Sequence, residues 1–380
     1  METTPNITLE PKHTFPWRGF LQSLMYFIIG LAVFFFSLDL MMAALQRMGS
    51  VVTDTLLLAT SNPFTGLFIG LLLSALIQSS SATTSITVVL VASGSLSLSS
   101  AVPLIMGANI GTTITSTIVS LSFISHKKEF RRAITSGTYH AFFNILTALI
   151  LFPLEYYFHF LSGLSQFIAV RFFHEPAGSA VETFSLLGAE ISSPVNFISA
   201  KIGNAYFLAA LSVVLLLGSM LFFRKMITNA LGVSAQEKLR KLIFNNSYKS
   251  FGWGLFITAA IRSSTVTTSL IVPLTAKKII RLRTGTAFIL GANIGTTITA
   301  FLVSAFNSYA AISIAWAHFL FNFIGVIIFF RTPYLKEVPY QMATQLGKLT
   351  LRYRVAGFLF LLLTFFLIPF SLIYLYHFSM

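Results

Sequence analysis

Two short polar runs carry the side chains with which this sequence could bind ions. The first is Gln-Ser-Ser-Ser-Ala-Thr-Thr-Ser at residues 78–85, and the second is Arg-Ser-Ser-Thr-Val-Thr-Thr-Ser at residues 262–269. Each is followed by Gly-Ala-Asn-Ile-Gly-Thr-Thr-Ile-Thr, at residues 107–115 and 291–299. Hydroxyl groups donate hydrogen bonds to anions or coordinate cations through their lone pairs, and Asn adds a carbonyl oxygen. The residue types therefore predict a site for an anion, a hard cation such as Na⁺, or both.

The elements that must position these runs are membrane helices. Of 380 residues, 55% are hydrophobic and only 9% are charged, whereas a soluble domain carries about 25% charged residues. About twenty apolar residues span a bilayer. Apolar segments fall near residues 19–46, 63–93, 101–124, 133–155, 204–223, 250–276, 284–306, 310–330 and 354–378. The composition predicts an all-α polytopic membrane protein with the lipid bilayer as its surroundings.

Charge and cysteine content exclude several functions. The 25 Lys and Arg residues outnumber the 11 Asp and Glu residues, but most of the basic residues lie between apolar segments, where they set orientation. Nucleic-acid binding is therefore not expected. The absence of Cys excludes disulfides, thiol catalysis and Cys-ligated metals. No nucleotide-binding motif and no activated-nucleophile arrangement occurs, so we expect neither an enzyme nor an ATP-driven pump.

Two apolar segments, 63–93 and 250–276, contain the polar runs in their middle. Each is roughly 30 residues long, too long for one upright helix at about 1.5 Å per residue. Non-helical backbone at membrane depth is tolerated only where protein or a wet cavity surrounds it. We interpret both segments as re-entrant helical hairpins. The glycines of the nine-residue motifs permit an unwound backbone, which predicts a broken helix after each hairpin.

The sequence contains an internal repeat. The nine-residue motif recurs unchanged 184 residues later, and Gln78 and Arg262 are separated by the same offset. His140 and Asn144 are echoed by His318 and Asn322 after a short deletion. Each of these pairs has helical i, i+4 spacing, and we expect hydrogen-bonded packing rather than a proton relay.

The predicted organisation is a cytoplasmic N-terminal tail at 1–18, repeat 1 at 19–155, an extracytoplasmic loop at 156–203, repeat 2 at 204–330, and a basic linker with a C-terminal transmembrane helix at 331–380.

The positive-inside rule orients the repeats. The loops at 126–132, 224–249 and 277–283 are basic, whereas the loop at 94–100 carries no charge. We therefore expect a cytoplasmic N-terminus, a first hairpin that enters from outside, a second that enters from inside, and an extracytoplasmic C-terminus. The halves would then be inverted repeats, which together with discontinuous segments indicate a secondary transporter with a midplane site. Small and hydroxylated residues also mediate helix packing, but their occurrence in two-fold register favours a site.

These motifs resemble those of the type II sodium-dependent phosphate cotransporters, a family with bacterial members. The resemblance covers about 20–330 and rests on the Gln-Ser-Ser-Ser run and the duplicated Gly-Ala-Asn-Ile-Gly-Thr-Thr motif. It implies Na⁺-coupled symport of inorganic phosphate by alternating access, in a bacterial inner membrane. Many bacterial relatives have a C-terminal regulatory domain, and this chain resembles a form without one. The resemblance implies no cofactor and no transition metal, with Na⁺ as the coupling ion; the assembly is undetermined, a homodimer being one option.

The resemblance also assigns candidate ligands. The expected phosphate ligands are Ser79, Ser80, Ser81, Arg262, Ser263, Ser264 and Thr265. The expected Na⁺ ligands are Gln78, Thr83, Asn109, Thr112, Thr113, Thr267, Asn293, Thr296 and Thr297.

Arg262 departs from the family pattern, which usually has Gln at both tips. A cation at bilayer depth is costly and is a functional candidate. Arg262 could bind the substrate with its planar fork, replace one coupling Na⁺ with a fixed charge, or form a structural pair with Asp39. Symport of another anion such as sulfate or a small organic acid, coupling to H⁺, and more distantly an anion channel, remain as alternatives.

Overall fold

A computed structural model describes residues 17–48, 62–173, 192–230, 243–305 and 308–378. All regular secondary structure in these residues is helical. Five helical stretches among them are long and apolar enough to cross a membrane, namely Leu98–Leu121, Lys127–Phe158, Leu282–Ser304, Tyr309–Arg331 and Val355–Tyr376. The prediction of an all-α polytopic membrane protein is confirmed.

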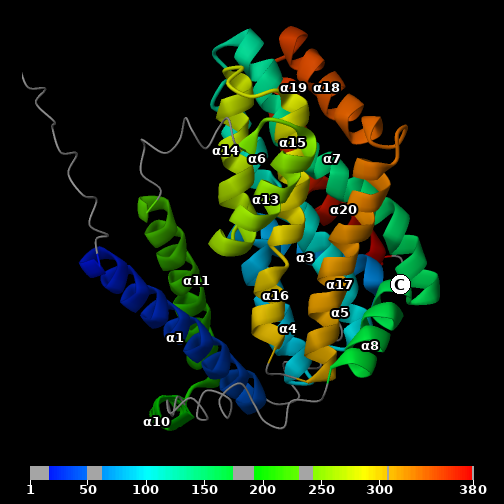
Figure 1. Ribbon diagram of the computed structural model, residues 1–380. Helices are drawn as coiled ribbons and strands as arrows, with labels where there is room; N and C mark the ends of the chain where they lie inside the picture. Colours follow the sequence, from blue (N-terminus) through cyan, green and yellow to red (C-terminus); the bar gives the residue numbers. More distant parts are fainter. Residues whose placement is uncertain (1–16, 49–61, 174–191, 231–242, 306–307, 379–380) are drawn as a thin grey trace, which may run out of the picture.

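The helices follow the sequence repeat (Figure 1). Repeat 1 contains α1 (Trp17–Met48), α3 (Pro63–Ile77), α4 (Ser80–Ala92), α5 (Leu98–Gly111), α6 (Ile114–Leu121) and α7 (Lys127–Phe158). Repeat 2 contains α11 (Ala205–Ala230), α13 (Ser247–Ile261), α14 (Ser264–Ala276), α15 (Leu282–Gly295), α16 (Ile298–Ser304) and α17 (Tyr309–Val326). The remaining elements are α8 (Phe160–Phe172), α10 (Ser192–Lys201), η2 (Ile327–Arg331), α18 (Glu337–Arg352), α19 (Val355–Leu362), η3 (Leu363–Leu367) and α20 (Ile368–Phe378).

The chain reverses between α3 and α4. A Cβ on Gly66 would lie 3.5 Å from the carbonyl oxygen of Ser100, and one on Gly70 would lie 1.9 Å from that of Leu104. Both contacts join residues 34 positions apart, so α3 and α5 run parallel with their first turns at the same level. Because α4 ends just before α5 begins, α4 must return antiparallel to α3. The α3–α4 segment therefore begins and ends on the same side of the molecule.

The α13–α14 segment has the same geometry. A Cβ on Gly291 would lie 1.9 Å from the carbonyl oxygen of Phe251, and one on Gly295 would lie 2.3 Å from that of Leu255. These contacts hold α13 parallel to α15, and α14 returns to the start of α15. In Figure 1 the loop after α4 and the loop after α14 lie at opposite ends of the bundle.

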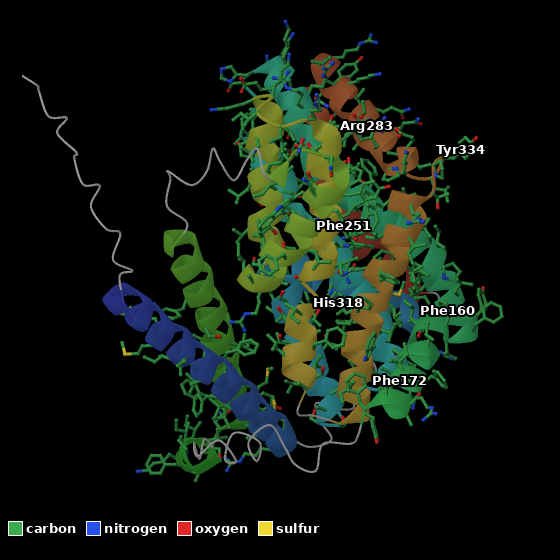
Figure 2. The ribbon with its side chains drawn as sticks, in the orientation of Figure 1. Phe160, Phe172, Phe251, Arg283, His318 and Tyr334 are labelled. Carbon is green, nitrogen blue, oxygen red and sulfur yellow. The ribbon has the colours of Figure 1, made fainter. Side chains whose placement is uncertain are left out.

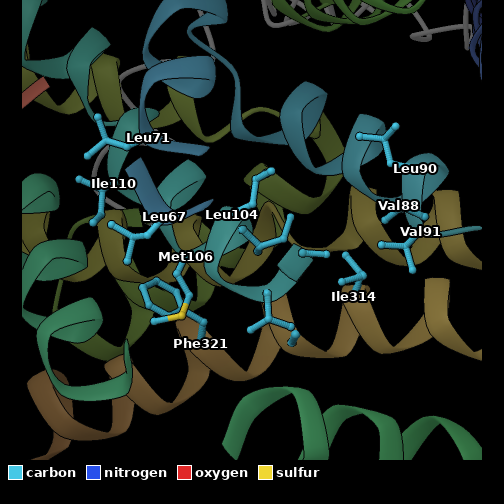
Figure 3. Close-up of a cluster of buried hydrophobic side chains, with 14 of the residues drawn as sticks. Leu67, Leu71, Val88, Leu90, Val91, Leu104, Met106, Ile110, Ile314 and Phe321 are labelled. Atoms are coloured by element: carbon cyan, nitrogen blue, oxygen red, sulfur yellow. The ribbon is translucent and has the colours of Figure 1, made fainter. Parts of the chain in front are cut away.

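Each hairpin has its own apolar core, and the two cores exchange a helix. Ile314 and Phe321 of α17, in repeat 2, pack into the core built by α3, α4 and α5 (Figure 3). Tyr139 and Phe143 of α7, in repeat 1, pack into the core around α15. The two repeats are thus interleaved. Helices α1 and α11 pack on each other beside this bundle, where Leu40 lies in a small core shared by the two helices (Figure 1).

The segments expected as a loop and as a basic linker both contain helices. The expected loop at 156–203 contains α8 and α10, while its residues 174–191 lie outside the described part. Glu155 stabilises the start of α8, because its Oε2 accepts from the backbone N–H groups of Leu161 and Ser162 at 2.7 and 3.0 Å. The expected linker after residue 331 contains α18, whose buried stripe of small residues includes Ala343 and Gly347. Tertiary packing against α7 makes that stretch helical.

The basic segments gather at one end of the bundle. The Arg132 guanidinium, on α7, donates to the carbonyl oxygen of Ala276 at 2.7 Å, beside the turn between α14 and α15. Arg283 at the start of α15 forms a bidentate ion pair with Glu337 of α18, at 2.8 and 3.1 Å. This end therefore carries the turn at residues 277–281, the first turn of α7, and α18.

Gly254 and Gly252 provide a matched test of the close approach between α13 and α15. A Cβ on Gly254 would lie 2.1 Å from the carbonyl oxygen of Phe288, whereas a Cβ on Gly252 would meet nothing within 4 Å. Gly254→Ala forces the helices apart and should cost about 1–3 kcal/mol or more. Gly252→Ala should be neutral or stabilise by up to about 1 kcal/mol. Melting temperatures in one detergent measure the difference, and equal melting of the two variants would contradict the packing.

Candidate functional site

The hairpin tips meet at the middle of the molecule. Each tip is a two-residue turn: α3 ends at Gln78 (φ 57°) and α13 ends at Arg262 (φ 56°), both in the left-handed region. Ser81 Oγ donates to the carbonyl oxygen of Arg262 at 3.3 Å, and Thr265 Oγ1 donates to that of Gln78 at 3.1 Å. These two contacts interchange when residue numbers are shifted by 184. The tips are thus related by the sequence repeat.

The same two hydroxyls contact the breaks in the helices that follow the hairpins. Ser81 Oγ lies 3.2 Å from Thr296 Oγ1, between α15 and α16. Thr265 Oγ1 lies 3.3 Å from Thr112 Oγ1, between α5 and α6. Each tip of one repeat therefore touches the broken helix of the other. The predicted residues Gln78, Ser81, Thr112, Arg262, Thr265 and Thr296 come together as one group.

The helix ends at the tips supply opposite partial charges. Ser79 and Ser263 are the N-cap residues of α4 and α14, and their hydroxyl oxygens accept from the backbone N–H groups of Ala82 and Val266. The first turns of both helices leave N–H groups that favour an anion. The last turns of α3 and α13 leave carbonyl groups that favour a cation. The centre can therefore accommodate an anion and a cation side by side.

Other predicted hydroxyls line the first turns of α4 and α14. Ser80 and Ser264 are 2% and 3% exposed, and Ser80 Oγ has no hydrogen-bond partner among the described residues. Thr83 Oγ1 donates to the carbonyl oxygen of Ser79 at 3.1 Å. Thr267 Oγ1 lies 2.8 Å from Thr258 Oγ1. These hydroxyl oxygens keep lone pairs for a ligand, and the unpartnered hydroxyl of Ser80 also keeps its proton.

Thr113 and Thr297 are turned toward their own helices. Their Oγ1 atoms donate to the carbonyl oxygens of Ile110 and Ile294, each at 2.7 Å. Both side chains are buried at the helix breaks. Their geometry matches across the repeat, as it does for the tip residues.

Asn109 and Asn293 belong to a buried polar network, which the assignment of metal ligands did not anticipate. His318 Nε2 lies 3.0 Å from Asn109 Oδ1, and His140 Nε2 lies 2.9 Å from Asn293 Oδ1. An amide oxygen only accepts, so both imidazoles donate through Nε2. Asn109 Nδ2 donates to the carbonyl oxygen of Ile105 at 2.9 Å. Each histidine comes from the repeat opposite its asparagine, and Figure 2 shows His318 at mid-height in the bundle.

Asn144 and Asn322 complete this network. Asn144 donates to the carbonyl oxygen of Asn109 at 2.6 Å, and Asn322 donates to that of Asn293 at 3.0 Å. Asn293 Nδ2 donates to the side-chain oxygens of both Asn144 and Asn322, at 3.0 and 2.9 Å. All four asparagines are fully buried. The signal in the sequence was the repeated His-x-x-x-Asn spacing, and the hydrogen bonds expected of these residues are present.

Arg262 occupies the C-cap position of α13, so its backbone belongs to the tip contact already described. Its guanidinium carbon lies 5.8 Å from the centre of the Phe34 ring of α1, within the range of a cation–π interaction. The side chain of Asp39, its expected partner in a structural pair, lies outside the described part of the chain.

Comparison with known proteins gives a consistent result. The family described as Na⁺/Pi-cotransporter matches residues 33–169 and 215–365. Sodium-dependent phosphate transport protein 2A of Rattus norvegicus is 31% identical over 416 residues, covering 89% of this chain. The 2B protein of Homo sapiens is 28% identical over 439 residues, covering 90%. The chain spans 65% and 64% of the length of these two relatives. No solved structure matches the chain.

His140→Ala should destabilise the protein, because it removes the donor to the buried Asn293 Oδ1. A buried acceptor left unsatisfied costs about 1–3 kcal/mol. His140→Gln, which keeps an amide N–H donor, should lose less stability than His140→Ala. His126→Ala is the control, since His126 is exposed at the start of α7 and its side chain makes no capping hydrogen bond. Thermal unfolding in detergent compares the three variants; a melting temperature of His140→Ala equal to that of the His126 control would refute the role of the bond.

Proposed function

Because the chain belongs to the Na⁺/Pi-cotransporter family, we propose that it is a secondary active transporter that couples inorganic phosphate to Na⁺. The relatives are named as sodium-dependent phosphate transport proteins, which supports this activity. The observation that carries the proposal in this chain is the two-fold group of tip hydroxyls and helix ends. It provides donors for an oxyanion and oxygen ligands for a hard cation in one place.

Phosphate binds at the first turns of α4 and α14. First-turn N–H groups there and the buried hydroxyls of Ser80 and Ser264 donate to its oxygens, with Ser79, Ser81, Ser263 and Thr265 around them. The unpartnered Ser80 hydroxyl supports this placement. Na⁺ binds among the carbonyl groups that end α3 and α13 and the nearby hydroxyls of Thr83, Thr112, Thr113, Thr267, Thr296 and Thr297. The neighbouring positive and negative helix ends explain why the two ions bind together.

Asn109 and Asn293 act on this site by holding the broken helices in position. Their side-chain oxygens accept from His318 and His140, so we assign them a positioning role in addition to the metal coordination expected from the sequence. Each oxygen retains a second lone pair.

Transport proceeds by alternating access. Hydrogen bonds of 3.3 and 3.1 Å join the two tips, and such contacts between neutral groups contribute only about 0.5–1.5 kcal/mol each. Separation of the tips on one side opens the site to that side. The basic end, with Arg132, Arg283 and the turn at 277–281, faces the cytoplasm by the positive-inside rule. The second hairpin then enters from the cytoplasm and the first from outside.

Phosphate uptake into proteoliposomes tests the activity. With an inward Na⁺ gradient we expect saturable accumulation of radiolabelled phosphate, because the cation and anion share one site; an equal K⁺ gradient should give none. Sulfate and a small organic acid serve as competitors, and a proton gradient without Na⁺ tests H⁺ coupling. Uptake driven equally by K⁺, or flux that does not saturate, would contradict Na⁺-coupled symport.

Arg262 contacts the transported anion in this proposal. Arg262→Gln removes a charge-assisted interaction, and the KM for phosphate should rise about tenfold. Arg262→Lys keeps the charge without the planar fork, so its KM for phosphate should lie between the values of the unmodified protein and Arg262→Gln. If the Na⁺ Hill coefficient rises while the phosphate KM stays constant, Arg262 instead replaces a coupling cation. Unchanged kinetics with a lower melting temperature would leave only a structural role.

A further inference from the structure

A pocket lies at the basic end of the bundle, apart from the hairpin tips. It is bounded by α7, the start of α13, α15, η2 and α18, and its polar lining includes Tyr139, Ser247, Tyr248, Arg283, Lys336 and Tyr340. Figure 2 shows Arg283 and Tyr334 at this end, with Phe172 at the opposite end of the molecule. None of these lining residues belongs to the transport site described above.

The charge of the pocket favours an anion. Its acidic side chain, Glu337, is engaged by Arg283 in the bidentate pair at 2.8 and 3.1 Å. The Arg283 guanidinium also lies 5.0 Å from the centre of the Tyr340 ring, which fixes its orientation. With Arg283 and Glu337 neutralising each other, Lys336 gives the lining a net positive charge. The exposed Arg281, on the adjoining turn, adds to the field.

The rim of the pocket is apolar and exposed. Tyr248, in the pocket lining, is 77% exposed, and its ring packs on that of Phe330, also in the lining, with ring centres 5.7 Å apart. Ile327, in η2, is 48% exposed. Exposed aromatic rings next to basic residues are suited to the interface of a membrane. A free anion would make no use of this apolar rim, whereas the acyl chains of a lipid would cover it.

We propose that this pocket binds the headgroup of an anionic phospholipid. The phosphate accepts hydrogen bonds from Lys336 and from the hydroxyl groups of Tyr248 and Tyr340, and the acyl chains lie against the rings of Tyr248 and Phe330. Basic pockets between membrane helices on the cytoplasmic side are suited to such headgroups. Glu337 of α18 forms an ion pair with Arg283 of α15. A lipid bound here would therefore also stabilise the packing of α18 on α15.

Native mass spectrometry of the delipidated full chain measures the proposed binding directly. Phosphatidylglycerol should bind in preference to phosphatidylcholine, because only the first has a net negative charge. Lys336→Gln should weaken phosphatidylglycerol binding about fivefold, the loss expected for one basic residue near a membrane surface. Tyr340→Phe removes one hydroxyl and keeps the ring that orients Arg283, so it should cause a smaller loss. Arg171→Gln is the control, since Arg171 is exposed on α8 at the other end of the bundle.

Several outcomes would overturn the assignment. Equal phosphatidylglycerol binding by Lys336→Gln and Arg171→Gln would contradict the proposed site. Equal binding of phosphatidylglycerol and phosphatidylcholine would contradict it as well. Full displacement of phosphatidylglycerol by an equal concentration of inorganic phosphate would identify a free-anion site instead of a lipid site. A phosphatidylglycerol-dependent rise in melting temperature that is lost only in Lys336→Gln provides a second positive readout. Neither measurement depends on transport, so failure here would leave the proposed symport untouched.

Discussion

The polar interior of this protein has to form its hydrogen bonds between its own groups, and the reciprocal His–Asn bonds do so for the Nε2 atoms of His140 and His318, while their Nδ1 atoms have no partner among the described residues. In a bilayer an unpaired polar group costs several kcal/mol, yet the centre of the bundle contains four asparagines and two histidines that are almost completely buried. The side-chain oxygen of each of the four asparagines lies within hydrogen-bonding distance of a donor in the network. Its two cross-repeat bonds, from His140 to Asn293 and from His318 to Asn109, can form only if the repeats are fully interleaved. The position of the broken helices follows from this requirement.

Interleaving determines which parts can move. Helix α17 is embedded in the core around the first hairpin, and α7 in the core around α15. Glycines then bring α3 onto α5 and α13 onto α15 with their backbones in contact. Shearing either pair would break dense packing, whereas in the described part of the chain hydroxyl contacts of 3.1 to 3.3 Å join each tip to the other tip and to the broken helix of the other repeat. In the proposed transport cycle, we therefore expect a change of access at the junction between the two hairpins and not inside either one.

Much of this architecture could be predicted from the sequence because the duplicated motif imposes strong constraints. Glycine and hydroxyl residues at a fixed offset of 184 identified the interruptions of the apolar segments, and the helices end there. Local patterns could not identify α8 or α18. The start of α8 depends on Glu155, which precedes it in the chain and caps it through the left-handed residue His159, and α18 depends on the surface of α7. The partners of Asn109 and Asn293 were also hidden, because the exchange of α7 and α17 between cores is a tertiary property.

The polar runs at 78–85 and 262–269 differ in charge at a single position, which makes that position informative. Position 262 carries a cation where its repeat counterpart, Gln78, carries a neutral amide, although both residues have the same backbone conformation and accept equivalent tip contacts. The dipoles of the four tip helices cancel any preference for one hairpin over the other, since their arrangement is nearly symmetric. The Arg262 charge does not cancel. In the proposed transport site this charge makes the electrostatic potential more positive near the second hairpin, so an anion held between symmetric donors should lie closer to that tip, and a coupling cation closer to the Gln78 tip.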